Sequence, residues 1–524
     1  MPISNIDIIS VIESKLKDKV QIQMGQLGKA AIVTSNGLHR DVLQAMTDAD
    51  EKTGISAITG LDLGANLGVL YHMRTSNAFV TIRAEVPKEN PKIQTIIDVV
   101  PGATFHELEV ADLFGIVFEG HPSPGHFVLS ENWPQGVYPL RKDVNANEVK
   151  LNPPTPEEAK TLEAGKQVKI IVGPQHPALL EPEKFTVTVD GETVTNVEPR
   201  IGYVHRGIEK ASESRTFLQD VYLVERICGI CNSIHACSFV ETVEKILKTE
   251  VPPRAKYLRT ITLELNRLHS HLLTLGHAGL EIGYETLFQY FWRDREPIMD
   301  LIELTSGNRV YSSLMTVGGV RRDLKDTDIP KIKSTLSDLR KKLPFYRQVY
   351  QDEPSIGLRM KNVGTLKRED ALKLSVVGPV ARGSGVDIDV RKDEPYEAYG
   401  EIPFKEIVYT QGDTWARMNV RMDEVEESIN IIEYAIDHMP TGPFRVKAPR
   451  VVPAGEAVNR VEAPRGELFY YVKSNGTAMP DRVKVRTPTF ANIPAFLKTA
   501  IGENIADVPP NLCSLDPCFS CTDR

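Results

Sequence analysis

Four of the six cysteines occur in two pairs that share the same spacing. Cys228 and Cys231 lie in the segment RICGIC, and Cys518 and Cys521 lie in the segment DPCFSC near the end of the 524-residue sequence. Cysteines separated by two residues are typical of metal sites and of redox-active dithiols. The chemistry predicted for this chain therefore depends on why two such pairs stand so far apart.

Three kinds of site contain such pairs. A structural zinc site is the commonest, but zinc ribbons usually separate their two pairs by only about 15–20 residues. A redox-active disulfide needs one pair and leaves the second unexplained. The third is a redox-active centre in which thiolates hold a soft transition metal such as nickel or iron. From the spacing alone, zinc and a redox metal both remain open.

Residues beside the first pair favour a metal. If the chain after Cys228 is helical, then Cys228, Cys231 and His235 share one face, because they occupy positions i, i+3 and i+7. Arg226 lies two residues before Cys228, where a cation offsets the charge of thiolates. The two remaining cysteines fall outside this spacing and are predicted to be ordinary buried thiols: Cys237 and Cys513.

Composition and charge exclude several other classes. A hydrophobic content of 41% and a charged content of 25% are typical of globular proteins. The net charge of −8 gives no reason to expect nucleic-acid binding. No uncharged apolar run approaches the roughly 18–20 residues of a membrane span, and the N-terminal segment lacks the basic region of a signal peptide. We therefore expect a cytoplasmic protein with reduced thiols.

The elements that must position the cysteines divide the sequence into two parts. Residues 1–145 mix strand-like runs such as AFVTIRAEV with helical patterns, which predicts an α+β domain. Residues 146–168 contain three prolines and no aromatic residue, which is typical of a linker. Residues 169–524 form the second predicted domain, which contains both cysteine pairs.

The second domain begins with a strand pattern and continues with helices. Residues 185–197 alternate on either side of Asp190-Gly191, which predicts a β-hairpin. Helical periodicity follows from Cys231 to about Lys342, with one apolar stripe formed by Leu265, Leu268, Leu272 and Leu275. A helix is predicted over residues 423–439 and a strand over residues 466–476. The predicted fold class is α+β, with a mainly helical bundle and small β-sheet pieces in the second domain.

The segments around both cysteine pairs resemble a known family. RICGIC followed by His235, together with DPCFSCTDR, is similar to the large subunit of nickel–iron hydrogenases of group 4, the energy-converting, membrane-complex group. GPQHPALLEPEKF and GPVARGSGVDIDVRKDEPYEAY fit that group and also resemble the quinone-pocket subunit of respiratory complex I. GATFHELEVADLFGIVFEGHP resembles the small peripheral-arm subunit of complex I. This order of modules is similar to the fused large subunit of formate hydrogenlyase complexes.

The resemblance implies that the two cysteine pairs hold one binuclear nickel–iron centre. All four thiolates would bind nickel, with Cys231 and Cys521 bridging to iron and Cys228 and Cys518 terminal. In this family the iron carries one carbon monoxide and two cyanides. We expect no iron–sulfur cluster in this chain, because such a cluster needs about four thiolates of its own.

Three further residues match functional positions of the family. Glu181 matches the proton-relay glutamate, and cleavage of hydrogen into charged fragments requires such a base. Arg465 matches the arginine that lies over the metals near the cyanides, a role that suits a permanent cation with several donors. His235 matches the histidine that bonds near a bridging sulfur.

Two motifs remain open. Asp387 and Asp389 could serve a proton route, a partner interface or the structure itself. His269 and His271 stand about 200° apart around a helix, so both cannot face one metal, and we expect them to be packing or interface residues.

Family resemblance also implies partners and a location. The expected partners are a small hydrogenase subunit with an iron–sulfur cluster, ferredoxin-like subunits, antiporter-like membrane subunits and a maturation endopeptidase that removes an extension after Arg524. The chain would then lie on the cytoplasmic face of the membrane through these subunits.

The predicted function is reversible hydrogen evolution by the catalytic large subunit of a nickel–iron hydrogenase. The alternatives are a complex I-like quinone-binding subunit and a sulfur-reducing relative. The quinone loop of complex I carries a second histidine where Leu180 stands here, after His176-Pro177. Sulfur-reducing relatives lose cysteine ligands, whereas this sequence keeps all four. Both observations disfavour the alternatives.

Overall fold

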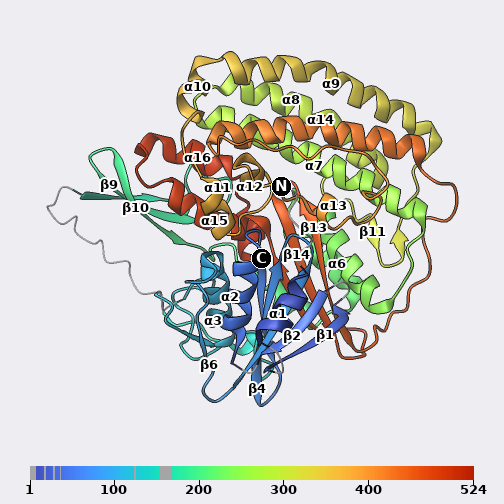
Figure 1. The fold of residues 1–524 in the computed structure, drawn as a ribbon. Helices are drawn as coiled ribbons and strands as arrows, with labels where there is room; N and C mark the ends of the chain where they lie inside the picture. The colour runs from blue at the N-terminus through green and yellow to red at the C-terminus, as the bar shows by residue number, and fades with distance from the viewer. Residues whose placement is uncertain (1–6, 17–18, 28–29, 36, 123–125, 154–166) are drawn as a thin grey trace.

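The computed structural model describes residues 7–16, 19–27, 30–35, 37–122, 126–153 and 167–524. Residues 154–166 of the predicted linker lie outside the described residues. The fold is a mixture of long helices and small sheets, which confirms the α+β prediction (Figure 1). In the described part of the chain, no helix combines the length and the apolar character needed to cross a membrane.

A five-stranded sheet organises the N-terminal part. Its spatial order is β1-β2-β5-β4-β3, with β2 and β5 parallel and the other neighbours antiparallel. The strands are β1 (Val20–Leu27), β2 (Ala30–Ser35), β3 (Gly54–Asp62), β4 (Asn66–Arg74) and β5 (Phe79–Pro87). Helix α2 packs against β5 and helix α3 against β3, and the helices of this part are α1 (Ile8–Leu16), α2 (His39–Ala49) and α3 (Thr104–Phe114). A parallel pair, β6 (Lys92–Gln94) and β7 (Val117–Glu119), completes it.

Four long helices form the bundle of the second part and lie side by side in Figure 1: α7 (Pro253–Glu281), α8 (Glu285–Ser306), α9 (Ile329–Asp352) and α14 (Thr414–His438). Helix α7 contacts both α8 and α14, so it is buried on nearly every side. Several of its buried polar residues therefore pair with groups of neighbouring segments. For example, Arg259 binds Glu244 and Glu397.

Two small sheets flank the bundle. The sheet β8-β9-β10 contains the hairpin predicted around Asp190-Gly191, since Asp190 pairs with Thr193. The sheet β13-β14-β15 packs one face on helix α6 and contacts β3 of the N-terminal sheet, with Phe469 and Tyr471 buried against Leu61 and Phe79. The strands are β8 (Gln167–Val172), β9 (Lys184–Asp190), β10 (Thr193–Arg200), β13 (Gly455–Ala463), β14 (Gly466–Ser474) and β15 (Pro480–Arg486).

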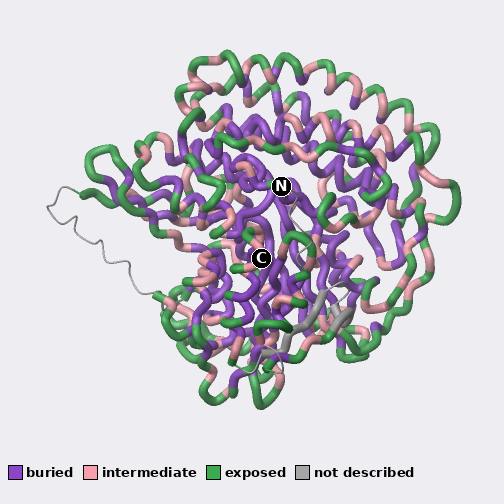
Figure 2. The backbone as a smooth tube through the Cα atoms, in the orientation of Figure 1, coloured by how far each residue is buried: buried purple, intermediate pink, exposed green. Residues whose placement is uncertain are grey.

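Further elements connect these layers, and three of the cysteines, Cys237, Cys513 and Cys521, lie on them. These elements are α4 (Ile208–Ser212), α5 (Phe217–Glu225), α6 (Asn232–Leu247), β11 (Met315–Thr316), β12 (Gly319–Val320), α10 (Pro354–Met360), α11 (Arg368–Lys373), α12 (Pro379–Gly383), α13 (Val390–Asp393), α15 (Pro488–Thr499), α16 (Val508–Ser514) and α17 (Phe519–Asp523). Helix α17 ends in the middle of the molecule, where buried residues dominate (Figure 2). The second cysteine pair is therefore held in the interior, between the bundle and the sheets.

Candidate metal centre

The structure brings the two cysteine pairs together. The Sγ atoms of Cys228 and Cys518 lie 3.2 Å apart, and those of Cys228, Cys518 and Cys521 all lie within 4.8 Å of one another. Cys231 adjoins them, since its backbone N–H donates to the Cys228 sulfur at 3.5 Å. All four thiols are free and only 2–3% exposed. Two segments from opposite ends of the second part thus form one buried cluster.

A tight turn, and not a helix, presents the first pair. The backbone N–H groups of Ile230 and Cys231 point at the Cys228 sulfur, at 3.2 and 3.5 Å, so residues 228–231 curl around it. Helix α6 begins only at Asn232. The helical face expected for Cys228, Cys231 and His235 therefore does not include Cys228.

The second pair depends on a bend before α17. Asp516 adopts a left-handed backbone conformation (φ 57°), which turns the chain toward the cluster. The backbone N–H of Cys518 then donates to the hydroxyl of Thr489 at 3.1 Å. One turn of helix follows, in which the N–H of Thr522 donates to the carbonyl of Cys518 at 3.0 Å. This turn places Cys521 on the same side as Cys518.

The electrostatics of the thiols fit a bound cation. Hydrogen bonds from the other three thiols lower the pKa of the Cys228 thiol well below its ordinary value. The bond with Cys228 raises the pKa of Cys231 to about 12, and it raises that of Cys518 too. Burial raises the pKa of Cys521. Four thiols that converge on one point in a buried site do not all lose their protons unless a cation compensates the negative charge. A soft metal bound to the sulfurs supplies that positive charge.

Arg465 lies at the turn between β13 and β14 and reaches into the cluster. Its Nη1 lies 3.3 Å from the Cys231 sulfur and 3.2 Å from the Ser270 hydroxyl. Its Nε and Nη2 donate to the backbone carbonyl and the carboxylate of Asp516, each at 2.7 Å. Arg465 thereby ties the second cysteine segment to the first. A further guanidinium nearby, that of Arg421, has buried nitrogens without a hydrogen-bond partner among the described residues.

Glycine permits this approach of Arg465. A Cβ on Gly378 would lie 2.5 Å from the carbonyl oxygen of Arg465 and 2.4 Å from the Cα of Gly466. Gly378 also has a positive φ of 65°. Both features require the absence of a side chain.

His235 connects Cys521 to the β13-β14-β15 sheet. Its Nε2 lies 3.5 Å from the Cys521 sulfur, and its Nδ1 lies 2.8 Å from the hydroxyl of Tyr470. Burial lowers the pKa of His235 to about 4. The imidazole is therefore neutral at physiological pH and orients one sulfur through its ring nitrogens.

Glu181 lies at the outer edge of the cluster and is half-buried. Its carboxylate accepts a hydrogen bond from the backbone N–H of Ser520 at 2.6 Å and a second from the Ser520 hydroxyl. A neighbouring carboxyl, that of Glu183, is fully buried beside Asp523. Burial and the charge of Asp523 raise the pKa of Glu183 to about 11. Two carboxyl groups thus line the segment that carries Cys518 and Cys521.

The remaining sequence candidates divide between the site and the scaffold. The Nε2 of His269 lies 3.1 Å from the carbonyl of Ile230, so this histidine supports the turn of the first pair. His271 instead pairs with Glu424 at 2.8 Å, away from the sulfurs. Asp389 pairs with buried Arg391, at 2.7 Å, and Asp387 pairs with Lys52 of the N-terminal part, at 2.9 Å.

Sequence reasoning misses the residues that support the site from distant segments. These are Ser270, Tyr470, Thr489 and Ser520. Hydroxyl-bearing residues are common, and the first three stand in no spacing that singles them out. Ser520 alone carries a signal, because it lies between the cysteines of the second pair.

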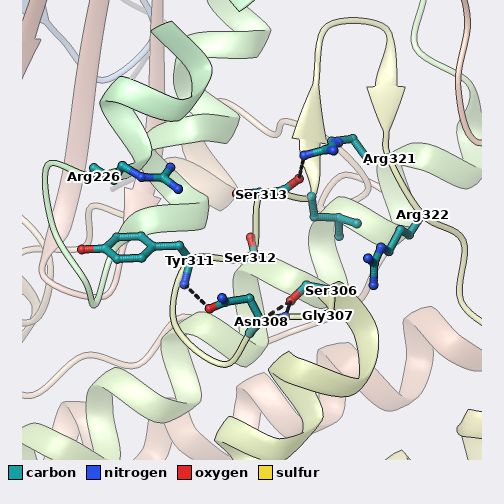
Figure 3. A pocket seen from close by; sticks show the side chains of 10 residues that line it. Arg226, Ser306, Gly307, Asn308, Tyr311, Ser312, Ser313, Arg321 and Arg322 are labelled. Atoms are coloured by element: carbon teal, nitrogen blue, oxygen red, sulfur yellow. Dashed lines mark hydrogen bonds between the residues drawn. The ribbon is translucent and has the colours of Figure 1, made fainter. Parts of the chain in front are cut away.

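A cavity of about 250 Å³ opens beside the first cysteine turn (Figure 3). Its lining includes three arginines, Arg226, Arg321 and Arg322, and no acidic residue among the described ones, but the buried carboxylate of Glu225 bonds to Ser312 and Ser313 of that lining. The Arg226 guanidinium lies over the Tyr311 ring, 5.0 Å from its centroid. Ser312 bonds at 2.9 Å to Ser233, two residues after Cys231. The cavity therefore abuts the segment that carries the first pair.

A second, much smaller cavity lies beside the bend at Asp516, which precedes Cys518. It has a volume of about 10 Å³ and is lined by residues that include Leu180, His277 and Asp516. Leu180 is 57% exposed. This cavity is thus sufficient for only a very small molecule.

Comparisons with known proteins match both parts of the chain. The family model described as the respiratory-chain NADH dehydrogenase 30 Kd subunit matches residues 32–150. The model of its 49 Kd subunit matches residues 281–453 and 449–524. The model described as nickel-dependent hydrogenase matches residues 206–278, which include the first cysteine pair.

Individual relatives span several complexes. The fused C/D polypeptide of the NADH-quinone oxidoreductase of Bacteroides fragilis is 36% identical over 90% of this chain and 95% of its own length. Formate hydrogenlyase subunit 5 of Escherichia coli is 35% identical over 87% of this chain and 81% of its own. The membrane-bound hydrogenase subunit alpha of Pyrococcus furiosus is 40% identical over 68% of this chain and 87% of its own.

A solved structure adds a further kind of complex to these relatives. A chain of the membrane-bound sulfane sulfur reductase, an archaeal respiratory membrane complex, is 34% identical and superposes with a TM-score of 0.66 over 68% of this chain and 99% of its own. These relatives are oxidoreductase subunits, and the fold is shared among them. The chain therefore belongs to the family in which complex I-like 30 kDa and 49 kDa modules are fused, a family that includes large subunits of group 4 hydrogenases.

Proposed function

We propose that this chain is the catalytic large subunit of a membrane-associated nickel–iron hydrogenase that evolves hydrogen from protons reversibly. One observation carries the proposal: four buried free cysteines from two distant segments meet in a single cluster, with Sγ atoms as close as 3.2 Å. A quinone-binding subunit has no need of such a cluster. Soft thiolates in this number suit nickel and iron.

The four cysteines would hold a binuclear nickel–iron centre with carbon monoxide and cyanide on iron, as the family resemblance implies. Cys228 and Cys518 would be terminal ligands, and Cys231 and Cys521 would bridge the two metals. When bound, this centre supplies the redox chemistry that interconverts hydrogen with protons and electrons. Arg465 would offer its buried guanidinium to the anionic ligands.

Glu181 would move protons between the cluster and the exterior. The Ser520 hydroxyl donates to Glu181, and Ser520 belongs to the segment that carries Cys518 and Cys521. Both carboxylate oxygens of Glu181 accept from Ser520, and its half-buried position keeps the group near solvent. A carboxyl group in this place can take up and release a proton without a large conformational change.

Electrons would leave through a partner subunit. The only cysteines outside the cluster, Cys237 and Cys513, are too few to hold an iron–sulfur cluster. The arginine-lined cavity of Figure 3 abuts the turn of the first cysteine pair, and its positive charge suits an acidic protein surface. We therefore place the docking face of a small, iron–sulfur-bearing subunit here. Ferredoxin-like and antiporter-like subunits would extend the complex to the membrane.

Two other functions occur among the relatives, and the experiment described below distinguishes them from the proposed one. The relatives include a quinone oxidoreductase polypeptide and a sulfane sulfur reductase.

An isotope-exchange assay separates the three functions. The purified complex is incubated with hydrogen in deuterium oxide, and in parallel with a quinone and with polysulfide under reducing conditions. We expect formation of deuterated hydrogen, which the Cys521→Ser variant loses and the Cys513→Ser control retains. Quinone or polysulfide reduction without isotope exchange would overturn the proposal.

A further inference from the structure

The side chain of Arg524 is buried deep inside the protein, three residues after Cys521. It is 2% exposed and stacks over the Phe490 ring, 5.3 Å from its centroid. A buried guanidinium is costly unless carboxylates neutralise it. The residues that do so come from two different parts of the chain.

Glu109 and Glu209 form the carboxylate pair around Arg524. Glu109 lies on α3 of the N-terminal part and accepts a bond from the Nη2 of Arg524. Glu209 lies on α4 and accepts from the Nε of Arg524 at 3.1 Å. Both carboxylates also bind Lys484 of β15, and Glu209 pairs with Arg482 at 2.8 Å. Three buried cations thus share two carboxylates.

The backbone around Arg524 is held as firmly as its side chain. The N–H of Arg206 donates to the Arg524 carbonyl at 3.2 Å. The carboxylate of Asp523 accepts from the N–H groups of Gly202 and Val204, at 2.9 and 3.0 Å. Residues 202–209 and Glu109 therefore form a socket for the end of α17.

This socket bears directly on the metal centre. Helix α17 has only five residues and contains Cys521, while Cys518 is its N-cap. So short a helix is not stable by itself and takes its position from what binds its ends. Arg465 holds the segment on the Asp516 side, before Cys518, and the Arg524 socket holds it after Cys521.

We propose that Glu109 is a positioning residue for the metal centre: the N-terminal part closes the site by binding Arg524, which fixes Cys518 and Cys521. The fused N-terminal module then helps to position the metal centre, in addition to being joined covalently to the second part of the chain. Its docking and the ordering of the second cysteine pair are one event, because α3 supplies a carboxylate that Arg524 needs in the interior.

The test compares three variants of the full chain. Glu109→Gln removes the charge that binds Arg524. Glu107→Gln is the matched control, since Glu107 is a buried carboxylate of the same helix that instead accepts from Thr95 and Ile96. Glu109→Gln combined with Lys484→Met removes one carboxylate and one cation together. It restores the charge balance without restoring the bond to Arg524.

The readouts are hydrogen exchange of residues 515–524, alkylation of Cys518 and Cys521 in metal-free chain, and nickel bound per chain. We expect Glu109→Gln to speed exchange and alkylation at least about tenfold and to lower nickel content, with Glu107→Gln unchanged. The double variant should remain as loose as Glu109→Gln. If Glu109→Gln fails to fold, the double variant carries the comparison.

Two results would overturn the inference. One is unchanged exchange and alkylation in Glu109→Gln. The other is full recovery in the double variant, which would mean that charge imbalance, and not the bond to Arg524, loosens the segment. Exchange and alkylation need no turnover. The failure of this inference and the failure of the proposed hydrogenase function therefore give different results.

Discussion

The carboxylate of Glu181 accepts two hydrogen bonds from Ser520, one from its backbone N–H and one from its hydroxyl. Ser520 lies between Cys518 and Cys521. A residue of the loop before β9 is thereby fixed to the helical turn that carries the second cysteine pair. This contact couples a carboxyl group near solvent to the thiol cluster, and it is the basis of the proposed proton route.

Removing the proton of Glu181 should stop turnover without removing the metals. Glu181→Gln keeps the shape and one of the two acceptor oxygens for Ser520. We expect the hydrogen–deuterium exchange rate to fall by at least about 10²-fold, the usual scale for a lost acid–base group, with nickel content unchanged. Glu198→Gln, at an exposed position of β10, is the control. An exchange rate in Glu181→Gln equal to that of the control would place the relay elsewhere.

Arg465 should tolerate no other cation. Arg465→Lys keeps the charge but loses the paired bonds to Asp516 and the contact with Cys231, because an ammonium lacks the planar fork. We expect hydrogen evolution to fall at least about tenfold and the infrared bands of metal-bound cyanide to shift. Arg460→Lys, on β13, tests for general effects on the sheet. Unshifted bands in Arg465→Lys would contradict its placement at the anionic ligands.

Gly378 should be irreplaceable for steric reasons. In Gly378→Ala the new methyl group would lie 2.5 Å from the carbonyl oxygen of Arg465. The turn that carries Arg465 must then shift, at a cost of about 1–3 kcal/mol in unfolding free energy, and activity should fall with it. Gly357→Ala is the control, because a Cβ there meets no atom within 4 Å. Equal melting temperatures and activities for the two variants would refute this interpretation of the turn.

Asp220 makes stability depend on pH. It is fully buried, and within the described residues neither carboxylate oxygen has a hydrogen-bond partner. Burial raises the pKa of Asp220 from 3.8 to about 8. The folded state therefore holds the proton more tightly than the unfolded state. As the pH rises from about 4 to about 8, the ionisation of Asp220 lowers the free energy of unfolding by up to about 1.4 kcal/mol per pH unit.

Asp220→Asn should remove this dependence. We expect the variant to melt higher than the wild type at pH 8 and to gain much less at pH 5, where the native carboxyl is already protonated in the folded state. Thermal unfolding at both pH values measures it, with exposed Asp48→Asn as the control. A gain that is equal at pH 5 and pH 8 would show that ionisation of Asp220 is not the cause.

Much of the architecture can be predicted from the sequence because it follows local patterns. The alternation around Asp190-Gly191 predicts the hairpin that the structure contains, since turn residues and period-2 patterning act over a few positions. The apolar stripe from Leu265 to Leu275 likewise predicts part of α7. The repeated cysteine spacing, with the family resemblance, predicts one shared site, and Cys228 and Cys518 do meet.

The contacts that shape the site cannot be predicted in this way. Tyr470 contacts His235, and Ser270 contacts Arg465, although the two residues of each pair are far apart in the sequence and no periodic pattern relates them. The spacing at Cys228 is compatible with a helix, but the chain forms a turn there, because the sulfur accepts from backbone N–H groups in place of helical bonds. Arg524 and Glu109 lie at distant points of the sequence, and only the packed interior reveals their ion pair.

Metal analysis of the purified complex, combined with infrared spectroscopy, tests the central claim most directly. We predict nickel and iron in equal amounts per chain, with bands from one carbon monoxide and two cyanides. Cys231→Ser and Cys521→Ser should each lose nickel and activity, because a hard hydroxyl substitutes poorly for a bridging thiolate, while Cys513→Ser keeps both. Zinc alone, without cyanide or carbon monoxide bands, would contradict the nickel–iron assignment, and so would a Cys521→Ser variant with full nickel and normal activity.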